Sequence, residues 1–162
     1  MHEAEAHEPS LAARSVRLVC FQLHEQELAL PIADVRETLR VPPITRVFLT
    51  PEWLLGILSL RGEIVPAIDL ALWLGLRPTG VEDASRLVVL RRGGKVLGVV
   101  VDELRELRSI EPDQISGPPP TLSPEQLRLL AGVAGTPTGT VRILSPEAIF
   151  ASERLRSLES IA

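Results

Sequence analysis

The sequence has little of what covalent cross-links, metal cages and base-stacking surfaces require. Its 162 residues include one cysteine, Cys20, no tyrosine, two tryptophans and three phenylalanines. A single cysteine excludes an internal disulfide and any metal site built from several cysteines. So few aromatic rings cannot form a platform for unpaired bases, and the net charge of −4 opposes sequence-independent binding to a phosphate backbone. The composition therefore disfavours a nucleic-acid-binding protein.

Long hydrophobic runs are also missing. Runs such as Val96–Val101 are far shorter than the roughly 20 residues of a membrane-spanning helix. The first eight residues are acidic and lack the basic start and apolar centre of a secretory signal. We expect a cytoplasmic protein that does not insert directly into a membrane.

Arrangements of residues typical of enzymes are missing too. His2 and His7 lie in the N-terminal segment and His24 lies in a predicted turn, so none is well placed for catalysis or metal binding. Cys20 lies in the middle of a predicted strand, which favours a small buried apolar side chain over a nucleophile. Neither a phosphate-binding loop nor a dinucleotide-binding glycine motif occurs. We expect no catalytic residue, no metal and no cofactor.

Many short runs of strand-forming residues predict an all-β protein of the barrel or sandwich class. Apolar residues make up 45% of the chain, enough for a well-packed core. Four hairpins are predicted, at residues 16–32, 54–70, 86–101 and 132–144. Single strands are expected at 35–39 and 102–110, and short helices should begin after the capping residues Asp69, Ser123 and Ser145.

The order of these elements repeats along the chain. Shifted by 69 residues, the Arg-Leu-Val at 17–19 falls on the same three residues at 86–88. Shifted by 76 residues, Gly56 falls on Gly132. Each half runs hairpin, strand, linker, glycine-started hairpin and short helix. The repeat therefore predicts two similar β-barrels packed against each other.

The segment Val96–Val101 carries no polar side chain, whereas a strand with one face in water alternates apolar and polar residues. Both of its faces should therefore be covered. One face belongs to the core of its own barrel, and either the sister barrel or a partner protein covers the other. Residues 54–58 raise the same question, and the sequence leaves both answers open.

Several motifs in order resemble the bacterial chemotaxis coupling protein family, CheW. Residues 60–70, Leu-Arg-Gly-Glu-Ile-Val-Pro-Ala-Ile-Asp-Leu, resemble the central signature of that family, and Gly56 matches its leading glycine. The segments 35–39 and 97–104 and the pair Gly132-Val133 are similar to further family motifs. The resemblance extends over most of the chain.

The resemblance implies an all-β fold of two SH3-like, five-stranded barrel subdomains on a shared core, with short helices including a C-terminal one. The expected divisions are a disordered tail at 1–15, a first barrel at 16–82, a second barrel at 83–145 and a C-terminal helix at 146–162. Together they would form one CheW-like domain.

The resemblance also implies a non-enzymatic adaptor. Such a protein couples the cytoplasmic tip of a chemoreceptor to the regulatory domain of a CheA-type histidine kinase, within an array at the membrane. The receptor-binding groove of the family falls here on Val35, Glu37, Gly56, Ile57 and Arg61. We expect Arg61 to brace its turn through carbonyl hydrogen bonds, the alternative being a pair with a receptor carboxylate.

Kinase contact is expected at Leu97 and Val99. The chain departs from the family pattern at Ser59, where the family has Asn, and at Ser145, where it often has Asp. These departures leave open a coupler that binds only the receptor or only the kinase in an alternative motility pathway. From a different class, a small-ligand-sensing β-barrel is the remaining alternative, and it would need a pocket of converging polar groups.

Overall fold

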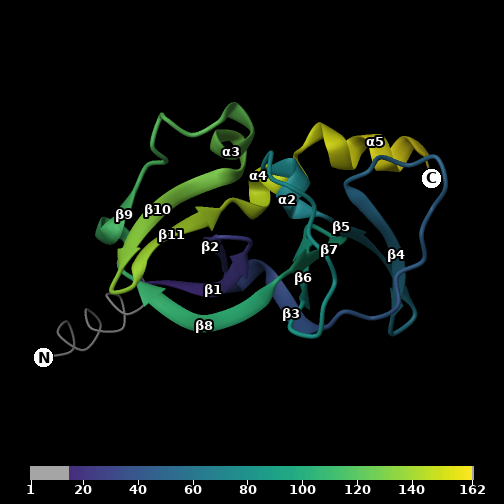
Figure 1. Cartoon of the computed structure of the whole chain (residues 1–162), viewed down its shortest axis with the longest axis horizontal. Helices are drawn as coiled ribbons and strands as arrows, with labels where there is room; N and C mark the ends of the chain where they lie inside the picture. The colour runs from purple at the N-terminus through teal and green to yellow at the C-terminus, as the bar shows by residue number, and fades with distance from the viewer. Residues whose placement is uncertain (1–14, 162) are drawn as a thin grey trace, which may run out of the picture.

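The structure is a computed structural model that describes residues 15–161 and folds them into two β-sheets with short helices (Figure 1). The strands are β1 (Val16–Leu23), β2 (Gln26–Pro31), β3 (Val35–Arg40), β4 (Leu54–Leu60), β5 (Glu63–Ile68), β6 (Arg86–Arg92), β7 (Lys95–Val101), β8 (Glu103–Ile110), β9 (Ile115–Ser116), β10 (Leu130–Thr136) and β11 (Gly139–Leu144). The helices are the 3-10 turns η1 (Ile32–Asp34) and η2 (Pro112–Gln114), followed by α2 (Leu70–Trp73), α3 (Pro124–Leu129), α4 (Pro146–Phe150) and α5 (Glu153–Ile161). The predicted all-β class is confirmed. The predicted tail, Ser15 apart, lies outside the described residues.

All four predicted hairpins form, as β1–β2, β4–β5, β6–β7 and β10–β11. Two of their turns have positive φ at both central residues: Arg61 and Gly62 at +49° and +81°, and Gly93 and Gly94 at +56° and +81°. This backbone shape matches the twist of the flanking strands, and glycine adopts it without strain. The local sequence therefore determines where each pair of strands reverses.

The strand pairing differs from the predicted division at residues 82 and 83. One sheet has the order β8-β1-β2-β11-β10-β9 and the other β3-β6-β7-β5-β4. Each sheet thus combines the first hairpin of one repeat with the single strand and second hairpin of the other repeat. The parallel pairs β2–β11 and β5–β7 join the two contributions. Sequence order does not reveal this exchange, because it depends on pairing between distant segments.

Three apolar clusters fill the molecule. One lies within each sheet, and a third and larger one lies between the sheets. The members of the third, which we call the shared core, are Phe21, Leu23, Leu28, Leu30, Leu54, Ile68, Leu70, Ala71, Trp73, Leu74, Val88, Leu90, Leu97, Val99, Val101, Leu129, Leu130, Leu144, Ile149 and Phe150. Strand β7 has no wet face, because Leu97, Val99 and Val101 enter the shared core while Val100 enters the cluster of its own sheet. The sister sheet, and not a partner protein, covers its second face.

The two repeats begin their short helices in the same way. Asp69 precedes α2 and accepts a hydrogen bond from the Ala71 N–H at 3.1 Å, while Ser145 precedes α4 and accepts one from the Ala148 N–H at 3.1 Å. The second carboxylate oxygen of Asp69 also accepts from the Thr79 N–H at 2.9 Å, in the linker to β6. Ser145 thus preserves the cap at a position where the family often has Asp. Its single hydroxyl oxygen leaves no second acceptor to hold a linker as Asp69 does.

The predicted single C-terminal helix is two helices, α4 and α5. Ser152 interrupts the helical path, and its hydroxyl accepts a hydrogen bond from the Arg154 N–H at 3.2 Å. A serine in this position caps a new helix more readily than it continues an old one. No helix in the described part of the chain is both long and apolar enough to cross a bilayer.

Gly56 provides space for the segment that precedes β4. A Cβ atom at this position would lie 2.2 Å from the carbonyl oxygen of Thr45 and 2.7 Å from the side chain of Ile44, and the φ of Gly56 is +149°. Because the glycine leaves this space free, Thr45 can exchange two backbone hydrogen bonds with Ile57, at 2.8 and 2.9 Å. The loop between β3 and β4 is thereby fastened to the sheet.

Gly132 plays the same part in the second repeat. A Cβ there would lie 2.7 Å from both the Ile115 side chain and the Ser116 carbonyl oxygen. Those two residues form β9, which pairs with β10. The repeated glycine is therefore a repeated packing site.

We expect Gly56→Ala to destabilise the protein by at least about 3 kcal/mol, because the added methyl group meets backbone and the φ is strained. Gly132→Ala should cost about 1–3 kcal/mol, since its φ is ordinary. Gly135→Ala, in the same strand as Gly132 but facing open space, is the matched control and should change stability by about 0.5 kcal/mol or less. Urea unfolding measures all three. Equal effects at Gly56 and Gly135 would refute the packing role.

Asp69→Ala should cost about 2–3 kcal/mol, because it leaves two backbone N–H groups without their acceptor, whereas Ser145→Ala should cost about 1 kcal/mol. Thermal unfolding compares the two variants, with Asp83→Ala, an exposed carboxylate in the same linker as Thr79, as the control. A loss at Ser145 as large as that at Asp69 would contradict the linker-holding role of the second oxygen.

Candidate partner-binding surface

The described residues offer binding chemistry rather than reactive groups. No three His, Cys, Asp or Glu side chains between residues 15 and 158 gather as metal ligands do. Cys20 is fully buried, and the loss of solvent around its thiol raises its pKa to about 11, which leaves it protonated and unreactive at neutral pH. It is the small buried apolar side chain that the sequence predicts.

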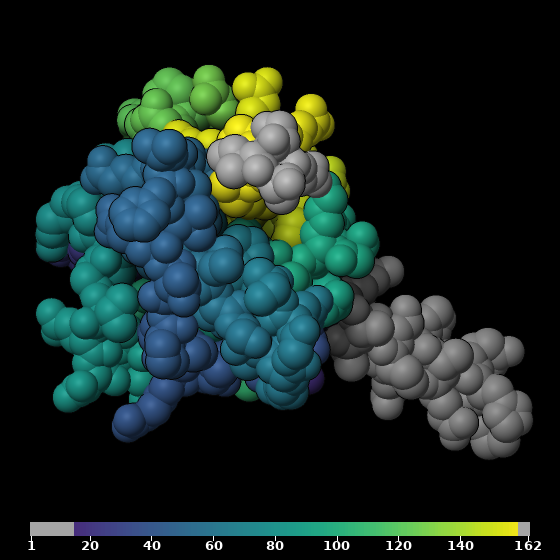
Figure 2. All heavy atoms as spheres, turned by 90° about the vertical axis from the view of Figure 1, so that its right-hand side faces the viewer, coloured from purple at the N-terminus to yellow at the C-terminus, as the bar shows by residue number. Residues whose placement is uncertain are grey.

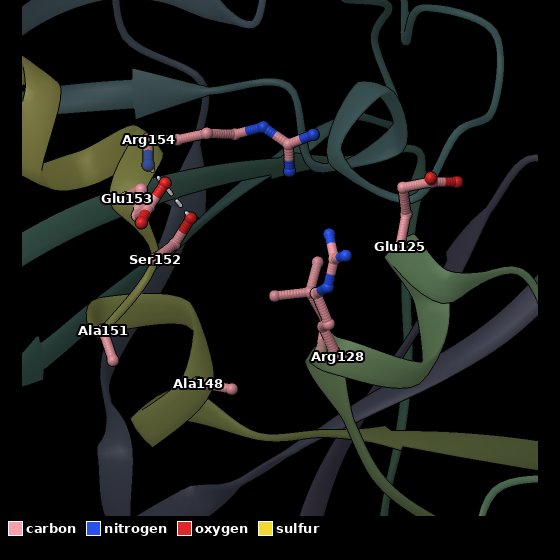
Figure 3. Close-up of a pocket in the computed structure, with 8 residues that line it drawn as sticks. Glu125, Arg128, Ala148, Ala151, Ser152, Glu153 and Arg154 are labelled. Atoms are coloured by element: carbon pink, nitrogen blue, oxygen red, sulfur yellow. Dashed lines mark hydrogen bonds between the residues drawn. The ribbon is translucent and has the colours of Figure 1, made fainter.

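A cavity of about 660 Å³ lies between α3, α4 and the start of α5 (Figure 3). Arg128 and Arg154 project into it from opposite walls, with Glu125 beside them. The Arg154 guanidinium also lies 5.4 Å from the centre of the Trp73 ring. This lining contains no nucleophile paired with a base, so the cavity offers no catalytic arrangement.

The predicted site residues Glu37 and Arg61 meet directly. Glu37 lies on β3 and Arg61 on the turn after β4, at opposite edges of the five-stranded sheet. Both terminal nitrogens of the Arg61 guanidinium donate to the Glu37 carboxylate, one of them at 2.7 Å. Such two-point pairing fixes orientation as well as distance. Arg61 is thus braced, as expected, but by a carboxylate and not by the predicted carbonyl groups.

A second ion pair cluster lies beside the first. The Glu63 carboxylate accepts from Arg36 at 2.7 Å and from Arg91 at 2.8 Å. These hydrogen bonds, Arg36 first, hold the pKa of Glu63 below its ordinary value. The pairing of β3 with β6 shifts register between Val35 and Glu37, which marks a bulge at Arg36. Because of this bulge, the Arg36 side chain reaches across to Glu63.

The two apolar members of the predicted site lie at different depths. Val35 is half-buried and packs against the shared core, while Ile57 is half-buried on the outer part of β4 and bonds to Thr45 through its backbone. Ile57 belongs to none of the three apolar clusters. The predicted set therefore lies on the two edge strands β3 and β4 and on the turn after β4, and the Arg61–Glu37 pair joins the two edges. Four cavities of about 340 to 660 Å³ lie elsewhere.

Gly56 contributes to this surface indirectly. It is buried, and Thr45 and Ile44 cover the space that a partner would have to enter. Its position supports the loop that flanks Ile57.

The prediction that Leu97 and Val99 contact a kinase is wrong. Both are 0% exposed and belong to the shared core. The prediction takes them as apolar residues at the end of a barrel, but the sister sheet covers the face of β7 on which they lie. A partner could reach them only if the two sheets separated.

Sequence reasoning missed Arg36, Glu63 and Arg91. Their charges are visible in the sequence, and the Arg-Glu pairs at 36–37 and 61–63 lie within the recognised motifs. Their convergence depends on the bulge in β3 and on the curvature of the sheet, neither of which has a sequence signal here. Thr45 was missed for the same reason.

Comparison with known proteins identifies the family of the chain. The family model described as the CheW-like domain matches residues 17–154. A probable chemotaxis protein CheW from Rhizobium etli is 31% identical over 134 residues, which cover 82% of this chain and 86% of that protein. The chemotaxis protein CheW of Helicobacter pylori is 31% identical over 135 residues, covering 83% and 81%.

A solved structure shares the fold. The crystal structure of the scaffolding protein TtCheW from Thermoanaerobacter tengcongensis superimposes with a TM-score of 0.74 at 32% identity, over 82% of this chain and 85% of that one. The matched residues 17–154 include strands of both sheets and both members of the Glu37–Arg61 pair. On sequence and on structure alike, the chain belongs to the CheW-like domain family.

Proposed function

We propose that the protein is a non-enzymatic adaptor that couples the cytoplasmic tip of a chemoreceptor to the regulatory domain of a CheA-type histidine kinase. It would work in the cytoplasm and associate with a membrane receptor array through these partners, with no cofactor. The observation that carries the proposal is the exposed, fixed Arg61–Glu37 pair at the position where the family motif carries its receptor-binding residues. Family membership supplies the identity of the partners.

A pre-ordered surface suits this role. The Arg61 side chain is 62% exposed, yet its guanidinium is held at two points by Glu37. A partner that docks here does not have to order a flexible arginine, so less binding free energy is lost to immobilisation. Val35 and Ile57 give the same surface partly exposed apolar area. We expect each such contact to be small and reversible. Many copies in an array would supply the remaining stability of the assembly.

We assign Arg61 a positioning role, in which it holds the β4–β5 turn over β3. Arg61→Glu should then weaken binding of a purified receptor signalling fragment about tenfold, because two carboxylates face each other and the turn moves away. The double variant Arg61→Glu with Glu37→Arg restores an ion pair and should recover most of the affinity. Isothermal titration calorimetry measures both. The exposed pair contributes little to folding, so the unfolding temperature should stay nearly constant.

The matched control exchanges Glu103 and Arg105, another exposed ion pair, on β8 of the other sheet; it should leave receptor binding unchanged. If the Arg61–Glu37 exchange fails to recover affinity, the guanidinium contacts the receptor directly and the positioning role is wrong. If Arg61→Glu has no effect, this surface does not bind the receptor. The kinase regulatory domain is titrated separately, and binding of only one partner would identify a coupler of the divergent type.

A further inference from the structure

One loop of the molecule displays apolar side chains that the fold does not use. In the loop between β3 and β4, Phe48 is 91% exposed and Leu49 is fully exposed. The other large apolar side chains with high exposure, Ile64, Val81 and Leu107, are 54–59% exposed and occur singly. Single exposed apolar residues are normal on protein surfaces, whereas an adjacent pair in full contact with water is not.

The backbone at this tip is strained. Leu49 has a φ of +61°, a left-handed conformation that leucine rarely adopts and that Asn or Gly adopts readily. Strain of this kind persists where the surroundings impose it, and it concentrates at binding sites. Here the left-handed backbone at Leu49, which leucine does not favour, accompanies the outward placement of Phe48 and Leu49.

The loop is also held in place, so the display is fixed. Thr45 exchanges two backbone hydrogen bonds with Ile57, and the Thr50 hydroxyl donates to the Val47 carbonyl oxygen at 2.7 Å. In Figure 2 the blue segment that contains this loop runs as a ridge over the face turned toward the viewer. A fixed projection fits a concave partner, and little ordering remains to be done when it docks.

The charge on the loop specifies the rim of that partner. Arg46, two residues before Phe48, is exposed and forms no ion pair or side-chain hydrogen bond with a described residue, and Glu52, the other charged side chain of the loop, is exposed as well. The chain as a whole carries a net charge of −4. The unpaired Arg46 guanidinium beside this apolar tip matches an apolar groove with a carboxylate at its border.

We propose that Phe48 and Leu49 are a second contact with the chemoreceptor, where they insert into the groove between two packed helices while Arg46 pairs with a carboxylate at its border. The inference rests on the proposed function. The receptor is the chosen occupant because Thr45 fastens the loop to Ile57, which is part of the proposed receptor-binding surface. The loop thus joins that surface at Thr45.

The test uses the full chain and a purified receptor signalling fragment in calorimetric titrations. Phe48→Ser combined with Leu49→Asn should weaken binding at least about tenfold. The unfolding temperature should not fall, and Leu49→Asn alone should raise it slightly, because Asn suits the left-handed backbone. Leu107→Ser, an exposed leucine on the other sheet, is the matched control and should bind normally. Arg46→Glu should weaken binding and reduce its dependence on salt.

Three further measurements identify the occupant. The same variants are titrated with the kinase regulatory domain and with vesicles of equal parts phosphatidylcholine and phosphatidylglycerol, and sedimentation velocity reports self-association. The inference is overturned if the variants change only kinase binding, only vesicle binding or only self-association.

Unchanged receptor binding in the double variant overturns it as well. If Arg61→Glu still weakens binding in that case, the proposed function stands and only the loop contact fails. If the unmodified chain does not bind the receptor fragment, both fail. If Phe48→Ser lowers the unfolding temperature, the affinity of the single variant Leu49→Asn for the receptor fragment decides the outcome.

Discussion

Burial of the shared core is the constraint on which the rest of the structure depends. Strands β1, β2, β6 and β7 each have apolar side chains on both faces, and one face of each is covered only when the two sheets pack together. The fully buried side chains of Phe21, Leu90 and Trp73 meet in that contact. Each such side chain contributes about 1.5–3 kcal/mol when it leaves water. Neither sheet can therefore reorient relative to the other without exposing most of the apolar interior.

This rigidity would keep the proposed binding surface in a fixed shape. The Arg61–Glu37 pair and the fastened β3–β4 loop lie on the same sheet, and neighbouring residues support both. Gly56 gives Thr45 its space, and the bulge at Arg36 lets that side chain reach Glu63. Binding surfaces of this kind take their shape from the scaffold below them, so substitutions at buried positions can change binding as much as those at the surface.

The sequence predicted what local physical chemistry controls. The turns at Gly62 and Gly94 and the cap at Asp69 follow from residues that are close together in the chain, and the two-fold repeat follows from the order of these local elements. Pairing between distant strands was not predictable, and so the division at residue 82 failed. Leu97 was assigned to a partner because a continuous apolar run does not reveal which neighbour covers it. Phe48 passed unnoticed, since only the folded structure shows that nothing covers it.

The exchange of hairpins between the repeats has a consequence for the integrity of the chain. Each repeat contributes a hairpin that completes the sheet of the other, which is the arrangement of a domain-swapped dimer joined into a single polypeptide. The linker between α2 and β6 carries the covalent connection between the repeats, and its Thr79 N–H donates to Asp69. Cleavage in that linker would leave two fragments, each with an incomplete sheet, that hold one another by complementation. The molecule is covalently one chain and, in its packing, a pair.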